Sequence, residues 1–236
     1  MSENRLLVSL ITPTYNEKEN IPLLAEEIFK TVADYPEMDV ELIVVDDNSP
    51  DGTGQIAERL QSQFPIQVVH RKKKLGLGSA VMAGFNRSER PFLGVIDADL
   101  SHDPIVLPDL ILGLKDHSLT IGSRYQTGSL VEDWPWYRKS ISQAGVLFAR
   151  RLTGVKDPLS GYFFLRREVL NELSLTSHGY KILLEILVKG RYESFVEIPF
   201  TFRNREFSTS KLNFKEYYLF VKQLLLFWMY KKKHTR

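Results

Sequence analysis

The chain has 236 residues, of which 43% are hydrophobic and 25% charged, and its formal net charge at pH 7 is +2. These are ordinary globular values, and the length suffices for a full core, as one large domain or a domain with an appendage. The small charge does not indicate nucleic-acid binding, and the basic residues form no stripe interleaved with aromatic ones. Because the chain has no cysteine, it has no disulfide framework and no thiolate chemistry, which suits a reducing compartment.

The N-terminal apolar run, residues 6–11, is short; Ser9 interrupts it and Glu3 precedes it. This pattern predicts a first strand rather than a signal peptide. No segment approaches the roughly 20 apolar residues that a membrane-spanning helix needs. We therefore expect neither a signal peptide nor a transmembrane helix.

Up to residue 125 the chain alternates apolar runs with amphipathic segments. The apolar runs predict strands over residues 6–12, 40–45, 66–70, 92–96 and 119–122. The amphipathic segments predict helices over residues 21–32, 55–64, 80–86 and 104–114. This alternation is typical of an α/β fold with a mostly parallel sheet and helices on both faces.

A polar loop follows the second predicted strand and reads DDNSPDGT, residues 46–53. It holds more acids than a turn needs, and an acid at a strand end can accept hydrogen bonds from ribose hydroxyls or a base edge. A helix cap is the structural alternative for Asp51 and Thr53. The loop is therefore a candidate nucleotide-binding segment.

A basic run, residues 71–74, precedes a glycine-containing stretch that opens a predicted helix. The third glycine of the dinucleotide fingerprint is replaced by Val81, which disfavours a nicotinamide oxidoreductase. A glycine-rich helix start beside cations could still meet phosphates. For Lys72, Lys73 and Lys74, a solvated loop is the favoured interpretation.

The strand predicted over residues 92–96 ends in two aspartates one residue apart, Asp97 and Asp99. Ligands of an open α/β sheet bind beyond the carboxyl ends of its strands. Two carboxylates there make a hard-oxygen site for Mg²⁺ or Mn²⁺, completed by substrate phosphates. The alternative is a pair of solvated aspartates in a turn.

The second half is less regular. It predicts a loop over residues 126–137, a turn over 156–161 and a polar segment over 203–211. Between these lie predicted helices over residues 138–152 and 179–189 and predicted strands over residues 162–165 and 196–202. Lys181 and Glu185 are one helical turn apart, a spacing that usually gives a weak surface contact.

The last predicted helix, residues 214–233, carries apolar and aromatic residues on nearly all faces and ends in three lysines. An aromatic-rich helix with a basic end is typical of a helix that lies in a membrane interface. The alternative is a core helix with a solvated tail. We expect a domain over residues 1–213 followed by an amphipathic, membrane-interfacial helix over residues 214–236.

Seven motifs occur in order along the chain: PTYNE, VVDDNSPDGT, DADLSH, GSRY, EDWP, DPLSG and SKL. With them the chain resembles the dolichol-phosphate mannosyltransferases, within the family 2 glycosyltransferases of GT-A fold. The resemblance implies metal-dependent transfer of mannose from GDP-mannose to dolichyl or polyprenyl phosphate. It also implies a location in the cytoplasm, peripherally on the cytosolic face of a membrane.

The resemblance implies roles for individual residues. Those that would bind the donor are Pro13, Tyr15, Glu17, Val45, Asp47, Asp97, Ala98, Asp99, Lys181, Arg205 and Lys211. Those that would bind the acceptor phosphate are Arg124, Arg138 and Ser142. Those that would hold the metal are Asp97, Asp99 and Ser101, and Ser101 stands where some members carry glutamine. Asp99, Arg124 and Arg205 would be the catalytic residues.

This chemistry suits the residue types present. A phosphate monoester is already anionic near neutral pH, so the acceptor has little need of a general base. The site must instead supply cations that hold two anions together, and arginine pairs bidentately with phosphate. A single in-line displacement would give a β-linked product from an α-linked donor.

Two alternatives remain. A family 2 enzyme could move another sugar, for example glucose from a UDP donor, to polyprenyl phosphate. A catalytically silent nucleotide-binding protein could recruit others to membranes, although the intact acid pair argues against it. A small membrane subunit is kept open as a partner, and no nucleic-acid partner is expected.

Overall fold

The computed structural model describes residues 5–131, 146–173, 175, 181–203 and 214–234, with the backbone alone for residues 131, 214–221 and 234. Within this part of the chain, seven strands form one sheet in the order β3-β2-β1-β4-β7-β5-β8. They are β1 (Leu6–Thr14), β2 (Met38–Asp46), β3 (Ile66–His70), β4 (Phe92–Val95), β5 (Leu119–Ser123), β7 (Phe163–Arg166) and β8 (Phe195–Pro199).

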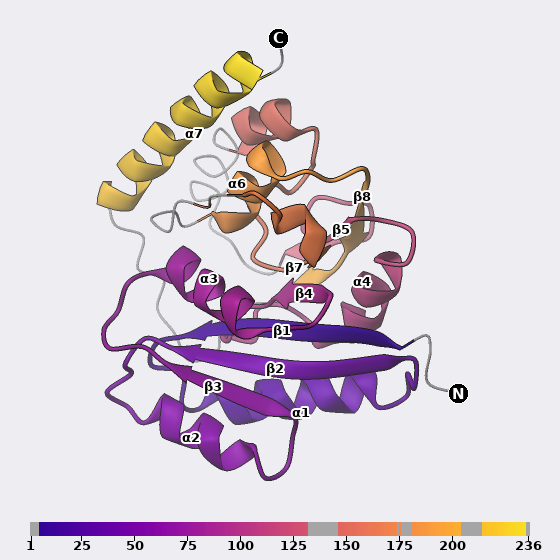
Figure 1. Cartoon of the computed structure of the whole chain (residues 1–236), viewed down its shortest axis with the longest axis vertical. Coiled ribbons are helices and arrows are strands. Elements are labelled where there is room, and N and C mark those ends of the chain that lie inside the picture. The colour runs from indigo at the N-terminus through magenta and orange to yellow at the C-terminus, as the bar shows by residue number, and fades with distance from the viewer. Residues whose placement is uncertain (1–4, 132–145, 174, 176–180, 204–213, 235–236) are drawn as a thin grey trace.

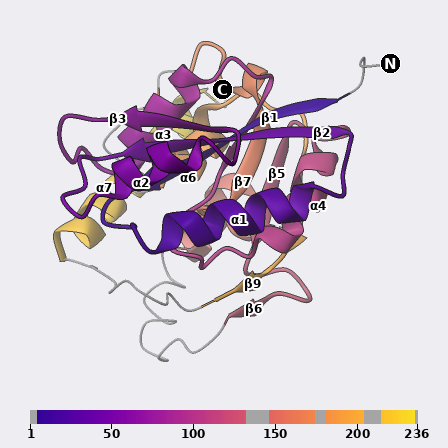
Figure 2. The same cartoon turned by 90° about the horizontal axis from the view of Figure 1, so that it is seen from below.

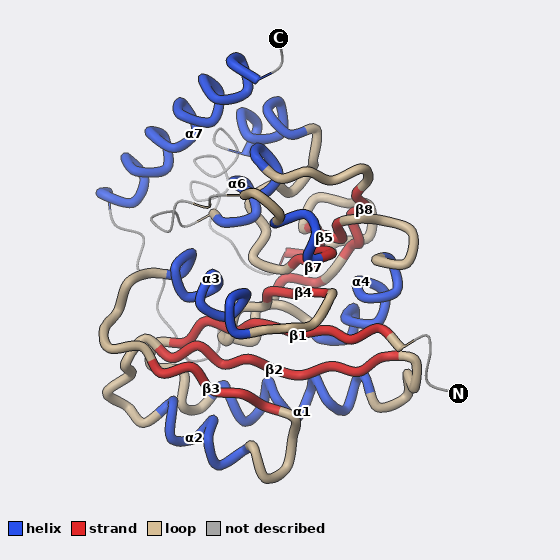
Figure 3. Tube along the Cα trace, viewed as in Figure 1, coloured by secondary structure: helices blue, strands red, loops and turns tan. Residues whose placement is uncertain are grey.

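The sheet, whose strands are red in Figure 3, is mostly parallel, as predicted, with one exception. β7 lies between β4 and β5 and runs antiparallel to both. All other neighbours in this sheet are parallel. β7, which comes after β5 in the sequence, thus lies between β4 and β5, although those two strands are consecutive in the sequence.

Helices cover both faces of the sheet (Figure 1). One face packs on α1 (Asn20–Val32), α2 (Thr53–Leu60) and α4 (Leu107–Gly113), and the other on α3 (Leu77–Arg87) and α6 (Ile182–Lys189). Successive side chains of β1 alternate between the two cores, with Leu10 in the first and Ile11 in the second. Burial on both faces explains why the central strands are nearly continuous apolar runs.

Two predicted elements are divided in the structure. The helix predicted over residues 104–114 begins with a 3₁₀ turn, η1 (Pro104–Val106), before α4. The strand predicted over residues 196–202 separates into β8 and β9 (Thr201–Phe202). β9 leaves the main sheet and pairs with β6 (Leu130–Val131), inside the segment predicted as a loop. Figure 2 shows this pair at the periphery of the molecule.

The C-terminal helix α7 (Phe214–His234) lies at the end of the molecule opposite α2 (Figure 1). Its Leu224 and Phe227 are buried in a third apolar cluster, together with side chains of α6 and of the helix at residues 146–153. No described helix combines the length and the apolar character needed to cross a membrane. The buried Leu224 and Phe227 dock α7 against the rest of the molecule.

The order of strands reverses beside β1, which has β2 on one side and β4 on the other. The connections from β1 and β4 therefore leave in different directions. In an open α/β sheet the crevice at the carboxyl ends of such strands is where ligands bind. We therefore expect a ligand-binding site at the residues that follow β1, β2 and β4.

Candidate active site

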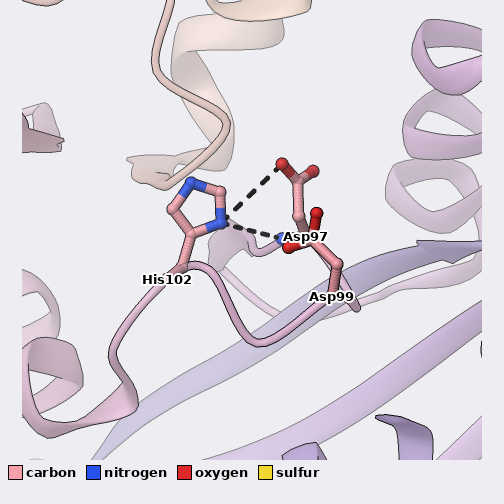
Figure 4. Close-up of side chains that lie close together, drawn as sticks. All are labelled: Asp97, Asp99 and His102. Carbon is pink, nitrogen blue, oxygen red and sulfur yellow. Dashed lines mark hydrogen bonds and ion pairs between the residues drawn. The ribbon is translucent and has the colours of Figure 1, made fainter. Parts of the chain in front are cut away.

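Three acidic side chains and one histidine lie just beyond the carboxyl ends of β2 and β4. Asp47 follows β2, and Asp97, Asp99 and His102 follow β4. One possible ligand atom of each of Asp97, Asp99 and His102 lies within 4.8 Å of those of the other two (Figure 4). Two carboxylates and an imidazole make a donor set that suits Mn²⁺, and the carboxylates also suit Mg²⁺.

A sharp turn after β4 brings these side chains together. Leu100 has a φ of 60°, a left-handed backbone conformation that a bulky residue seldom adopts. Beyond it, the Ser101 amide and hydroxyl both donate to Asp99 Oδ1, at 3.1 and 2.5 Å. These two hydrogen bonds orient the Asp99 carboxylate. They also give the Ser101 hydroxyl a partner other than a metal, and its assignment as a ligand stays a prediction.

His102 was not assigned a role from the sequence, although it lies in the DADLSH motif. Its Nδ1 accepts a hydrogen bond from the Asp97 amide at 3.4 Å and lies 3.7 Å from Asp97 Oδ2 (Figure 4). Because Nδ1 accepts, the neutral ring carries its proton on Nε2. The Nδ1 lone pair accepts this long hydrogen bond, and a metal ion would bind the same lone pair in place of the amide.

The surroundings of His102 keep the ring neutral. It is buried among the rings of Tyr162, Phe200 and Phe202, with centroids 5.3, 5.5 and 5.7 Å away. This burial lowers the pKa of His102, and the attraction of Asp97 and the other nearby carboxylates offsets only part of the effect. A neutral imidazole is the form that binds metals.

A glycine lets the next segment approach the acid pair. A Cβ atom on Gly161 would lie 2.9 Å from Asp97 Oδ2 and 3.2 Å from His102 Cε1. Any side chain here would push against both groups. The turn at residues 157–161 is thus built against the metal-binding candidates.

On the nucleotide side, Asp47 is engaged by the loop that leads into α3. Its carboxylate pairs with Arg71 at 2.8 Å and accepts from the amides of Leu75 and Gly76 at 3.1 and 3.3 Å. Lys74 is exposed, as expected, and its Nζ lies 3.7 Å above the ring of Tyr15. The loop therefore covers two of the predicted donor-binding residues.

Other donor candidates lie around the same crevice. Pro13 and Val45 are register partners at the ends of β1 and β2. The Glu17 amide donates to Thr53 Oγ1 at 2.9 Å, and the Glu17 carboxylate accepts from Asn20 at 2.6 Å. Ala98, between the two aspartates, is buried inside the turn.

Asp51 and Thr53 have structural contacts, although the N-cap of α2 is Gly52 rather than either of them. The Asp51 carboxylate accepts from the amide and hydroxyl of Thr53 at 3.0 and 2.6 Å and from the Lys18 amide at 3.3 Å. Burial alone would raise the pKa of Asp51, but these bonds outweigh it and lower the pKa. Both residues thus organise the loop before α2.

On the other side of the acid pair, Arg124 follows β5 and meets Asp157. Arg124 Nε and Nη2 donate to the two carboxylate oxygens at 2.8 Å each, and the Arg124 amide donates to Oδ2 at 3.0 Å. Burial alone would raise the pKa of Asp157, but the guanidinium outweighs it and lowers the pKa. Burial opposes the charge on Arg124 as well, yet Asp157 raises the pKa of Arg124.

Lys181 reaches the same turn from the start of α6. Its Nζ lies 3.5 Å from the carbonyl oxygen of Leu159, and its charge lowers the pKa of Asp157 further, after the larger effect of Arg124. Glu185 is buried rather than at the surface, and its carboxylate pairs with Lys189, one turn further along α6. Two of the predicted phosphate-binding cations, Arg124 and Lys181, therefore meet at residues 157–159.

Four predicted site residues lie outside the described part of the chain: Arg138, Ser142, Arg205 and Lys211. Asp157 is the functional candidate, besides His102, that sequence reasoning did not single out. Asp157 is the first residue of the DPLSG motif, so this motif, which supports the family resemblance, could have identified it.

Comparison with known proteins gives a family. The model of glycosyl transferase family 2 matches residues 9–174. A dolichol-phosphate mannosyltransferase of Pyrococcus furiosus is 44% identical over 92% of this chain, which spans 62% of that protein's length. A dolichol-phosphate mannosyltransferase of Saccharomyces cerevisiae is 37% identical over 94% of this chain and 87% of its own length.

A solved structure supports the fold. Glucosyl-3-phosphoglycerate synthase from Mycobacterium tuberculosis, in complex with Mn²⁺, uridine-diphosphate-glucose and glycerol 3-phosphate, has a TM-score of 0.68. The two are 20% identical, and the match covers 98% of this chain and 81% of that one. The predicted GT-A fold is confirmed.

Proposed function

Because the chain belongs to glycosyl transferase family 2, among the dolichol-phosphate mannosyltransferases, we propose that it transfers mannose from GDP-mannose to a polyprenyl phosphate such as dolichyl phosphate. One observation carries the proposal. A carboxylate pair at the strand-order reversal lies against a turn that gathers two cations. Such a site can bind a metal-diphosphate donor beside an anionic acceptor.

On the donor side, Asp97, Asp99 and His102 would hold the metal, as Mn²⁺ or Mg²⁺. When bound, a divalent ion supplies Lewis-acid stabilisation to the negative charge that develops on the departing diphosphate. The hydrogen bonds from Ser101 hold the Asp99 carboxylate in place for this role. The donor diphosphate would lie next to Ala98, between the two aspartates.

The nucleoside of the donor would occupy the crevice beyond β1 and β2. The ring of Tyr15 offers a face on which a base can stack, and the Glu17 and Asp47 carboxylates offer acceptors for ribose hydroxyls or a base edge. Pro13 and Val45 line the same strand ends. Lys74 has to leave the face of Tyr15 or lie over the base when the donor binds.

On the acceptor side, Arg124 would hold the lipid phosphate, joined by Arg138 and Ser142. The resemblance implies that Lys181 binds the donor, but its Nζ reaches the same turn as Arg124, and we therefore place it on the acceptor side. Arg205 and Lys211 would contact the donor and acceptor phosphates. The phosphate monoester attacks the anomeric carbon as an anion, so no base is assigned. A single displacement inverts that carbon, and NMR detection of an α-linked product would contradict this mechanism.

The lipid acceptor fits a surface of α7, which we name the outer face: Leu225, Leu226, Trp228 and Met229. All four side chains are close to half exposed, and their spacing places them on one side of the helix, opposite the buried Leu224 and Phe227. The exposed Lys222 precedes this face, and Lys232 and Lys233 follow it.

An apolar helix face flanked by lysines matches the interface of an anionic bilayer. The core-helix alternative leaves the outer face unexplained. We therefore assign residues 214–236 to peripheral binding at the cytosolic face of a membrane, with residues 1–213 as the catalytic domain. A small membrane subunit is a further candidate partner.

The test is transfer of label from nucleotide sugars to a short polyprenyl phosphate. GDP-mannose, GDP-glucose, UDP-glucose and UDP-GlcNAc are run in parallel, each with Mn²⁺ and with chelator. Chelator-sensitive, lipid-soluble label from GDP-mannose alone is the expected result. Label from a UDP-sugar would overturn the mannose assignment, and no label from any donor would favour a silent binding protein or a missing subunit.

A further inference from the structure

Residues 157–161 form a turn, hereafter the DPLSG turn, whose side chains have no assigned role. We propose that this turn is the positioning element of the acceptor-phosphate site. In this role Asp157 fixes the guanidinium of Arg124 so that its remaining donors face the phosphate. The proposal rests on the proposed function, because it concerns the acceptor of the same reaction.

The first argument is the geometry of the ion pair. Asp157 has no exposed surface, and both of its oxygens accept from Arg124, at 2.8 Å from Nε and 2.8 Å from Nη2. A guanidinium has five N–H donors, and this contact uses two of them. Among the described residues, the second proton of Nη2 and both protons of Nη1 have no hydrogen-bond partner, and they can meet an anion.

The second argument is that the plane of the guanidinium is restricted from other directions. Its central carbon lies 5.5 Å from the ring centroid of Phe202 and 5.7 Å from that of Tyr125. The Arg124 amide also donates to Asp157 Oδ2, at 3.0 Å, so backbone and side chain are held by one carboxylate. An arginine restricted in this way pays little conformational entropy when a phosphate binds.

The third argument is how the turn itself is held. Glu197, on β8, accepts from the amides of Lys156 and Asp157 at 2.8 and 2.9 Å. The Ser160 amide closes the turn on the Asp157 carbonyl at 3.3 Å. Asp157 therefore projects from a backbone that is anchored to the sheet.

The same turn contacts other parts of the site. Its Leu159 carbonyl lies 3.5 Å from Lys181 Nζ, and its Gly161 lies against Asp97 and His102. Five consecutive residues thus contact an arginine, a lysine and the metal-binding candidates. A structural ion pair elsewhere in the core would have no reason to combine these contacts.

The test measures binding of a short polyprenyl phosphate by isothermal titration calorimetry, together with transfer kinetics. The variants are Asp157→Asn, Arg124→Gln and the double variant, and Asp109→Asn is the control. Asp109 is an exposed acid of α4, so this control removes one negative charge away from the site. Circular dichroism and thermal unfolding verify that each variant is folded.

Asparagine at position 157 turns an N–H group toward the guanidinium and releases Arg124. We expect lipid-phosphate affinity to fall on the order of 10- to 100-fold, as for other residues that orient a ligand-binding group. The acceptor KM rises while the KM of the nucleotide sugar stays within about threefold. The double variant binds as Arg124→Gln does, because both changes remove one interaction.

Asp157→Glu, which keeps the charge and lengthens the side chain, should restore part of the affinity. Three results would overturn the proposal. Asp157→Asn could bind the lipid phosphate more tightly, as expected if Asp157 only opposes the anion. Asp157→Asn could bind the lipid phosphate as well as Asp109→Asn does. Finally, the double variant could show the combined affinity losses of Asp157→Asn and Arg124→Gln.

If Asp157→Asn does not fold, Glu197→Gln replaces it. Glutamine keeps one acceptor for the two amides of the turn, and a smaller increase of the acceptor KM alone is expected. An unchanged acceptor KM would then contradict the proposal. If the wild-type chain binds the lipid phosphate without transferring any sugar, the proposed function fails, while the binding series still decides the role of Asp157.

Discussion

The two sides of the candidate site carry opposite charge. The donor side presents two carboxylates and a neutral imidazole, Asp97, Asp99 and His102, and needs an added cation before it can bind a diphosphate. The acceptor side presents built-in cations, Arg124 and Lys181, with Asp157 as their counter-ion. A site of this kind can bind two anions side by side, each held chiefly by its own group of residues.

The sides also differ in how they are assembled. The donor side follows β1, β2 and β4, whose carboxyl ends are adjacent in a parallel sheet. The acceptor side combines the end of β5, the DPLSG turn before β7 and the start of α6. The difference leads us to expect that donor-side changes alter metal dependence and acceptor-side changes alter lipid-phosphate binding.

The largest effect is expected from Asp99→Asn on the donor side. Asparagine still fits the turn and can accept from Ser101, but it lacks the charge that holds a divalent ion. Transfer should fall about 1000-fold or more, because metal stabilisation of the leaving group is worth several kcal/mol. Steady-state kinetics over a Mn²⁺ titration measure this.

The matched control is Asp116→Asn, at an exposed acid after α4, which should leave transfer unchanged. If Asp99→Asn kept its metal dependence and changed only the acceptor KM, the division of the site into two sides would be wrong.

The next effect concerns the lipid and the outer face of α7. Replacing Trp228 and Met229 by serine should weaken binding to anionic vesicles on the order of 100-fold, since each apolar side chain contributes about 1.5–3 kcal/mol when fully buried. Co-sedimentation with phosphatidylserine-containing vesicles measures partitioning.

Ile105→Ser is the control, because Ile105 is 69% exposed and lies in η1, far along the chain from α7. Equal partitioning of all three proteins would mean that the outer face of α7 does not bind the bilayer.

A third prediction distinguishes His102 from Ser101 as the metal ligand that acts together with Asp97 and Asp99. His102→Gln should lower Mn²⁺ affinity on the order of 10- to 100-fold, whereas Ser101→Ala should have a smaller effect because its hydroxyl donates to Asp99. Titration with electron paramagnetic resonance of free Mn²⁺ gives the affinities without any substrate.

His117→Gln serves as a control for the loss of an imidazole outside the site. The reverse order of Ser101→Ala and His102→Gln would restore Ser101 as the ligand predicted from family resemblance.

The smallest effect is the pH dependence that Asp157 contributes. Its folded pKa is lower than the unfolded value of about 3.9. The stabilisation is therefore present above the unfolded pKa and is lost as pH falls through the folded pKa, at no more than about 1.4 kcal/mol per pH unit.

Urea unfolding of wild type and Asp157→Asn between pH 5 and 3 should show their stabilities converging as pH falls. A constant difference would mean that the Asp157 carboxylate is not charged in its pair with Arg124.

Local pattern was sufficient for much of this protein. The apolar runs predicted the strands of the first half, and the position of Asp97 and Asp99 after β4 predicted the metal-binding candidates. This succeeds because a buried strand and the acids that follow it are neighbours in sequence. The ordered motifs carried the family assignment in the same way.

Only the tertiary structure decided the acceptor side. β7 enters antiparallel between β4 and β5, and this brings Asp157 to Arg124, which is 33 positions away. The left-handed conformation at Leu100 turns His102 toward Asp97, while the periodicity of the segment contains no sign of that direction. Periodicity determines which face of an element is buried, but the packing of distant segments determines which polar groups meet there.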